Sequence, residues 1–248
     1  MAINIGVTGS TGRFIGGGAG VFRDNTLKLY LDPFKYSAYT GESDGTFEDL
    51  SGWGNNITLV GGAQTRSNGY WSFDGTNDFG YRTDDSDFDY GTTTDFSLQF
   101  WYRNLGGDVF IGLMGKGNDF STGWYLWRST NENLYLGIGS ASTLYSGGSS
   151  VDWESGWQNV AVCVDRSSNA KFYQNGILVA TDTSTSTAYN ISTDRYLVIG
   201  GIQGSNSTTS ANFELNGFMG QVMIYSGKVL SEDQVRQNFN AHRGIYGV

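Results

Sequence analysis

Two short runs of acidic residues are the first candidates for chemistry in this sequence. The stretch 42–48 holds three acids around Gly45, and Asp152 and Glu154 form a second, alternating pair. Hydrolysis of a glycosidic bond needs two carboxyl groups that face one another across a groove. However, Gly45 favours a turn in the first run, and the second run lies in a connection rich in Gly and Ser. We therefore predict that these acids are solvated loop residues and that the protein is not an enzyme.

Other kinds of catalysis have few residues to use. His242 is the single histidine and Cys163 the single cysteine, so a Ser-His-Asp triad would have to use His242, and a zinc site has no cluster of ligands. We interpret His242 as a packed helix residue and Cys163 as a buried strand residue. The glycines at 16–20 are not followed by the Gly-Lys-Ser/Thr of a phosphate-binding loop. We expect no cofactor, with calcium as the alternative.

Asp85, Asp87 and Asp89 are the candidate calcium ligands. If this segment is extended, alternate residues share one face, and hard carboxylate oxygens suit calcium. The segment does not fit an EF-hand, because Tyr90 occupies the place of the glycine and Phe96 that of the last acid. A solvated run of charges is the alternative.

Aromatic residues supply the candidate binding surface. The set comprises Trp101, Trp124, Tyr125, Trp127 and Tyr135. These residues belong to predicted strands whose two faces are both aromatic. One face must form the core, whereas rings on the other could line a groove and stack on the C–H faces of sugars. Trp101 has the opposite parity to Phe100, so we expect it to face the groove. Core packing or a subunit contact is the alternative for each tryptophan.

The elements that would position these residues are short strands. Alternation of apolar and polar residues predicts strands at 27–32, 70–73, 96–102, 124–128, 134–138, 158–165, 171–174, 177–181, 196–199 and 221–225. Asn175-Gly176 supplies the positive φ angles that a type I′ hairpin turn requires. Frequent turn signals, without a strand–helix–strand rhythm, predict an all-β sandwich or barrel.

One helix is expected near the end of the sequence. Ser-Glu-Asp-Gln at 231–234 has the pattern of a capping box, with acids at the positive end of the helix dipole. Val235, Phe239 and His242 share one helix face. Gly244 is expected to end the helix.

Composition and charge limit the class of protein. The 248 residues include 15% aromatic residues and 37 glycines against a single proline, which fits one large β domain with tight turns. The net charge of −9 repels phosphate backbones and anionic lipids. We therefore expect no nucleic-acid partner. No stretch of the sequence approaches the length of apolar residues that a membrane span needs, so we also expect no membrane insertion.

Residues 1–26 differ from the rest because glycines crowd positions 9–20. Ordering a backbone residue costs roughly 1–2 kcal/mol, which glycine cannot recover by burying a side chain. We predict that 1–26 is an attachment arm and that the sandwich comprises 27–248, with a homo-oligomer as the expected state. The expected contact residues of the arm are Ile3, Ile5, Val7 and Phe14, and the first three alternate as in a strand that pairs with a partner's sheet edge.

Several motifs carry a family resemblance over about residues 27–245. They are Leu29–Asp32, Asp49–Asn56, Phe73–Asp78, Phe96–Trp101, Trp157–Val160, Phe172–Gly176 and Gly220–Tyr225 with the helix that follows. In this order they resemble the concanavalin A-like lectin/glucanase superfamily, and in particular its laminin-G-like domains. The resemblance implies a two-sheet antiparallel jelly-roll sandwich with one short C-terminal helix. Glucanases of this superfamily carry E-x-D-x-E or E-x-D-x-x-E on a strand, whereas the last acid of 42–48 comes one place too late.

The C-terminal motifs are similar to domains of structural proteins of tailed phages. We therefore predict a non-enzymatic virion protein, a capsid decoration, head-fibre or tail-associated protein that presents a lectin-like domain for surface or glycan adhesion. Its partners would be capsid or other virion proteins and a cell-surface glycan. With no signal peptide evident, it would be made in the host cytoplasm and displayed on the virion surface. The alternatives are a free carbohydrate-binding module and a glycan hydrolase or lyase.

Overall fold

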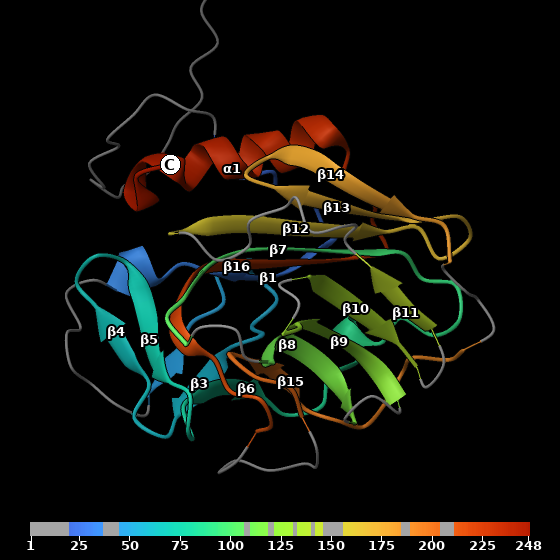
Figure 1. Ribbon diagram of the computed structural model, residues 1–248. Coiled ribbons are helices and arrows are strands. Elements are labelled where there is room, and N and C mark those ends of the chain that lie inside the picture. Colours follow the sequence, from blue (N-terminus) through green and yellow to red (C-terminus); the bar gives the residue numbers. More distant parts are fainter. Residues whose placement is uncertain are drawn as a thin grey trace, which may run out of the picture.

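Two antiparallel sheets stacked face to face form this protein, and one helix covers the outside of one of them (Figure 1). The computed structural model describes residues 20–36, 45–106, 110–118, 122–130, 133–139, 142–145, 156–184, 189–203 and 211–248. The predicted two-sheet sandwich with a C-terminal helix is confirmed.

Sheet A is the sheet that carries the helix. Its strand order is β14 (Ile177–Asp182), β13 (Ala170–Gln174), β12 (Gln158–Val164), β7 (Phe96–Asn104), β16 (Asn216–Ser226), β5 (Tyr70–Asp74) and β4 (Gln64–Arg66), and β1 (Leu27–Leu31) also pairs with β16. The Asn175-Gly176 hairpin between β13 and β14 is confirmed, since both residues have positive φ angles, 50° and 78°.

Sheet B lies on the other side of the core. Its strand order is β11 (Ser142–Tyr145), β10 (Leu134–Ile138), β9 (Thr122–Arg128), β8 (Ile111–Asn118), β15 (Leu197–Ile199), β6 (Phe79–Arg82), β3 (Ile57–Val60) and β2 (Thr46–Phe47). Two short 3₁₀ helices, η1 (Pro33–Tyr36) and η2 (Ser86–Phe88), lie in the connections. Within the described residues, no helix has the length and apolar character needed to cross a lipid bilayer.

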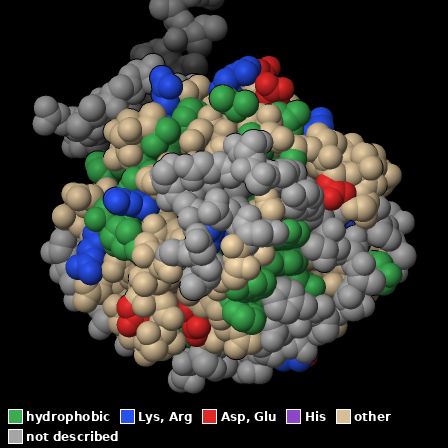
Figure 2. All heavy atoms as spheres, viewed as in Figure 1, with side chains coloured by type: hydrophobic (Ala, Val, Ile, Leu, Met, Phe, Trp, Pro, Cys, Tyr) green, Lys and Arg blue, Asp and Glu red, His purple; other side chains and the backbone are tan. Residues whose placement is uncertain are grey.

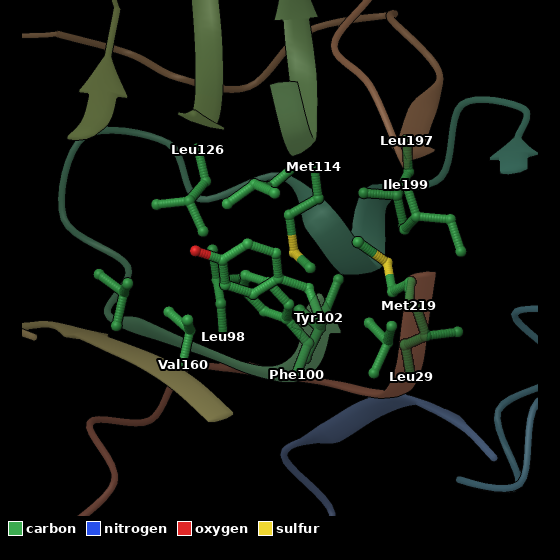
Figure 3. Packing of buried hydrophobic residues seen from close by; sticks show 14 of the residues in the cluster. Leu29, Leu98, Phe100, Tyr102, Met114, Leu126, Val160, Leu197, Ile199 and Met219 are labelled. Atoms are coloured by element: carbon green, nitrogen blue, oxygen red, sulfur yellow. The ribbon is translucent and has the colours of Figure 1, made fainter. Parts of the chain in front are cut away.

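The core lies between the inward faces of the two sheets. Leu98, Phe100 and Tyr102 of β7 point toward Met114 and Leu126 of sheet B (Figure 3), and all five side chains are fully buried. Burying a large apolar side chain contributes about 1.5–3 kcal/mol. The inward face of β7 is therefore the one that its alternation predicted.

Helix α1 (Glu232–Tyr246) begins at the predicted capping box. Ser231 Oγ accepts a hydrogen bond from the backbone N–H of Gln234 (3.3 Å), and the Gln234 side chain accepts one from the backbone N–H of Ser231 (2.9 Å). The prediction that Gly244 ends the helix is wrong. The left-handed cap is Gly247 (φ 72°), because Tyr246 continues the helix and packs on the sheet.

Polar residues on the outward face of β7 hold α1 on sheet A. Ser97 Oγ accepts a hydrogen bond from the backbone N–H of Leu230 (3.0 Å), just before the helix. Gln99 donates to the backbone carbonyl of Val235 (3.0 Å) and accepts from the Asn238 side chain (2.9 Å). Breaking any of these hydrogen bonds would leave a buried polar group without a partner, which is costly. The bonds therefore fix the position of α1 on sheet A.

The sandwich begins earlier than residue 27. Val21 is buried, the backbone N–H of Phe22 donates to Asn238 Oδ1 (2.6 Å), and the backbone carbonyl of Phe22 accepts from the Tyr225 hydroxyl (2.8 Å). Residues 20–26 thus pack on the domain instead of belonging to a separate arm. The expected arm contacts at Ile3, Ile5, Val7 and Phe14 lie outside the described residues.

Candidate functional site

Trp101 is the first of the predicted sugar-binding residues. It lies on the outward face of sheet A, as its parity predicts, but α1 covers it. Its ring centroid lies 5.6 Å from that of Phe239 and 4.5 Å from that of Tyr246, and its side chain is fully buried. The prediction that Trp101 faces an open groove is therefore wrong, because two helix residues seven positions apart cover it.

Trp124 faces the core between the sheets. Its Nε1 donates to the backbone carbonyl of Phe88 (3.1 Å), and its ring packs near Tyr90 (5.7 Å between centroids). Because the side chain is fully buried, it offers no surface to a sugar, and this prediction is also wrong.

Tyr125, Trp127 and Tyr135 lie together on the outward face of sheet B. Trp127 stacks on Tyr135 (5.3 Å between centroids, 13° between planes) and on Phe110 (6.0 Å). The Tyr125 hydroxyl donates to the backbone carbonyl of Gly139 (3.0 Å). The structure thus brings three predicted residues together, but Tyr125 and Trp127 are only 4% and 7% exposed. Most of their ring surface is already in contact with protein.

The three candidate calcium ligands do not share one face, because residues 86–88 form the 3₁₀ helix η2 and not an extended segment. Each carboxylate pairs with a different basic side chain: Asp85 with Arg82 (2.6 Å), Asp87 with Lys28 (3.2 Å) and Asp89 with Lys116 (2.7 Å). Within the described ranges, no three Asp, Glu, His or Cys side chains are placed to hold a metal ion. This geometry contradicts the predicted arrangement of the calcium site.

Little of the two acidic runs is described. Glu48 lies on the surface and pairs with Lys35 (3.6 Å). The acids of 42–44, with Asp152 and Glu154, lie outside the described residues. The prediction of a protein without paired catalytic acids stays a prediction.

His242 belongs to α1 and is buried on the side of the helix that faces the domain, in a chain of polar groups. Its Nε2 lies 3.2 Å from the Tyr30 hydroxyl, which donates to Asp32 Oδ2 (3.3 Å). The ring is only 7% exposed, so a substrate has no access to it. Burial lowers the pKa of His242 below its ordinary value of 6.5, more than nearby Asp32 raises it. The imidazole is therefore a neutral structural group.

The buried imidazole makes stability depend on pH. The unfolded state takes up a proton on His242 near pH 6.5, whereas the folded state takes it up only at lower pH. The stability that neutral His242 supplies is thus complete above pH 6.5. It is lost as the pH falls from 6.5 toward the lower pKa that His242 has in the folded state. We expect urea unfolding between about pH 7.5 and about pH 5 to show a larger loss for the wild type than for His242→Gln. Equal losses would contradict this assignment, and Arg236→Gln, an exposed change on α1, is the control.

One end of sheet A's outward face is not covered by α1. There, pairing of β7, β16, β5 and β4 aligns Arg103 with Phe218, Phe218 with Ser72, and Ser72 with Gln64. Trp157 directly precedes Gln158, which pairs with Tyr102, so Trp157 continues this row beyond Arg103. The next outward position of β5 is Tyr70, which pairs with Arg66. We call Trp157, Arg103, Phe218, Ser72, Gln64, Tyr70 and Arg66 the Trp157 patch.

Three half-buried aromatic rings form the centre of the Trp157 patch. The ring centroid of Tyr70 lies 4.7 Å from that of Phe218 and 5.4 Å from that of Trp157. Trp157 also contacts Tyr246, at 4.4 Å, where α1 ends. The helix therefore stops at the edge of the patch and leaves part of each ring accessible.

Polar and cationic side chains border these rings. Arg103 and Arg66 are exposed, and Arg66 Nη2 donates to Ser72 Oγ (3.1 Å). Figure 2 shows hydrophobic side chains next to Lys and Arg on the side where β4 and β5 lie. Ring faces for stacking, next to donors in a fixed row, are what recognition of a sugar requires. Sequence reasoning missed all three rings, Tyr70, Trp157 and Phe218, although the alternation of β5 could have placed Tyr70 on the outward face.

The two sheets, the covering helix and the aromatic surface define a lectin-like β-sandwich. Residues 74–236 match the family model of the concanavalin A-like lectin/glucanases superfamily. The chain belongs to this superfamily, as its motifs predicted. No curated protein sequence matches it.

Solved structures share this fold at low sequence identity. The binding domain of botulinum neurotoxin DC in complex with rat synaptotagmin II is 16% identical, with a TM-score of 0.63, and the match covers 88% of this chain and 52% of that one. The binding domain of Paraclostridial Mosquitocidal Protein 1 is 17% identical, with a TM-score of 0.62, and the match covers 90% of this chain and 55% of that one. Trypanosoma rangeli sialidase in complex with the inhibitor DANA is 16% identical, with a TM-score of 0.60, and the match covers 88% of this chain and 33% of that one. The chain thus spans about half of the first two proteins and a third of the sialidase.

Proposed function

We propose that this protein is a non-enzymatic lectin-like module that binds carbohydrate through the Trp157 patch. The observation that supports this most is the set of three half-buried, mutually contacting rings at the end of sheet A that α1 does not cover. Their position on paired strands keeps the spacing of the rings fixed, which lowers the entropy that binding must overcome.

The Trp127 cluster on sheet B is a weaker candidate for this site. Both tryptophans contact other rings, but Trp127 is only 7% exposed, whereas Trp157 is half-buried. A sugar gains contact only with ring surface that is accessible before binding. We therefore assign the first contact to Trp157.

Replacing Trp157 by alanine is expected to weaken glycan binding roughly tenfold or more, because the sugar loses a stacking face. Trp157→Tyr, which keeps an aromatic face, is expected to retain part of the affinity. The measurement is binding to a glycan array, followed by calorimetric titration of each glycan that binds. Melting temperatures of the variants separate loss of the site from loss of the fold.

Trp53→Ala is the matched control, because Trp53 is 50% exposed but lies in the loop between β2 and β3. Its affinity is expected to equal that of the wild type. If Tyr135→Ala loses binding and Trp157→Ala does not, the glycan binds on sheet B and not at the Trp157 patch. A wild type that binds no glycan, or one that releases reducing ends from a bound glycan, would overturn the proposed function.

We further propose that the module is displayed on a phage particle. This setting rests on the resemblance of the motifs at 220–225, 230–231 and 238–240 to domains of tailed-phage structural proteins. The test is whether the chain copurifies with virus particles through a density gradient and is labelled on their surface. A chain that is absent from washed particles would leave the free carbohydrate-binding module as the alternative.

A further inference from the structure

Resting on the proposed function, we infer that the sugar bound at the Trp157 patch carries a carboxylate and that Arg103 is its partner. The juxtaposition that carries this inference is an exposed guanidinium, without a partner among the described residues, on the strand between those of two half-buried aromatic residues whose ring centroids lie 6.2 Å apart.

Arg103 differs from most basic residues of this acidic protein. The chain has 24 acidic and 15 basic residues, and Lys28, Lys116 and Lys228 each pair with an aspartate. Within the described residues, the Arg103 guanidinium has no ion pair and no hydrogen bond, although it is exposed on a central strand. A cation that is left free where acids are in excess is available to an anionic ligand.

The position of Arg103 is fixed by the pairing of β7 with its neighbours. Phe218 of β16 lies directly opposite, and Trp157 continues β12 on the other side. Side chains directly opposite in a sheet have Cβ atoms about 4.5–5.5 Å apart. A sugar ring stacked on either aromatic side chain therefore brings its substituents within reach of the guanidinium.

The chemistry of the guanidinium selects among substituents. Its planar donors match the two oxygens of a carboxylate, which they bind in a bidentate way, and it is less strongly hydrated than an ammonium group. Arg66 adds a second positive charge to the patch. Asp74, the acid next to Ser72 on the outward face of β5, accepts a hydrogen bond from the backbone N–H of Thr76 (2.9 Å) in its own turn. Two guanidinium groups beside this one carboxylate leave the row with a net positive charge.

The test compares pairs of sugars that differ only in the charge of the carboxylate. The probes are galacturonic acid hexasaccharide, sialyllactose and the methyl ester of each. We expect one of the acids to bind about tenfold tighter than its own ester, with a preference that falls as salt increases. Arg103→Gln is expected to abolish this preference, so that acid and ester bind with equal affinity. Arg103→Lys is expected to retain only part of it, because the ammonium is not bidentate.

Arg236→Gln, an exposed substitution on α1, is the matched control and is expected to keep the full preference. Equal affinity of the wild type for acid and ester would overturn the inference, and the proposed function would stand if Trp157→Ala still abolished binding of both. A preference that survives in Arg103→Gln would also overturn it. Failure of both forms of both sugars, with binding of poly-glutamate in their place, would indicate a protein partner and contradict both proposals.

Discussion

Replacing Trp101 by alanine is expected to lower the free energy of unfolding by about 3–5 kcal/mol, the range measured when a buried tryptophan or phenylalanine is removed. Trp101 is fully buried between sheet A and α1, and its ring stacks on Phe239 and Tyr246. Its removal leaves a cavity that these two rings cannot fill without moving the helix. The polar anchors at Gln99 and Asn238 resist such a movement.

Denaturant unfolding followed by fluorescence and by circular dichroism is the measurement for this prediction. Trp101→Phe is expected to recover part of the loss, because an aromatic ring still stacks on Tyr246. Trp53→Ala, at an exposed position where the ring contacts the Lys28 ammonium, is expected to change the free energy by no more than about 1 kcal/mol. A Trp101→Ala protein with normal stability and weaker glycan binding would contradict this prediction and indicate that Trp101 contacts the glycan.

Two truncations of the N-terminus are expected to differ sharply. Deleting 1–26 is expected to lower the free energy of unfolding by about 3 kcal/mol or more, because buried Val21 is lost and two buried polar groups lose their partners. Those groups are Asn238 Oδ1 and the Tyr225 hydroxyl, which bond the backbone of Phe22. Deleting 1–19 leaves every one of these contacts in place, so we expect a stability close to that of the full chain.

The shorter truncation also tests the attachment hypothesis. If 1–19 is the attachment arm, the protein that lacks it folds but no longer joins its assembly. Sedimentation of each truncated protein with its particle, beside its unfolding curve, separates the two effects. Normal incorporation without 1–19 would contradict the arm, and equal stability of the two truncations would contradict the packing of 20–26.

The sequence by itself determined the local geometry of this protein. Alternation along β7 placed Leu98, Phe100 and Tyr102 on the inward face and Trp101 on the outward face, because successive side chains of a strand point in opposite directions. The hairpin at Asn175-Gly176 and the start of α1 at Ser231 were also predicted, since each depends on bonds or φ angles within a few residues.

Only the tertiary structure decided which outward-facing residues are accessible. Trp101 and Arg103 have the same parity on β7, yet α1 buries the first and leaves the second exposed. Where the helix lies depends on contacts such as Gln99 with Val235, which are 136 positions apart in the sequence. The aspartates at 85–89 likewise turn toward Lys28 and Lys116, which come from separate strands. Strand parity is set by the backbone of each residue and its neighbours, whereas exposure is set by the distant segments that pack on it, and a linear pattern does not contain their positions.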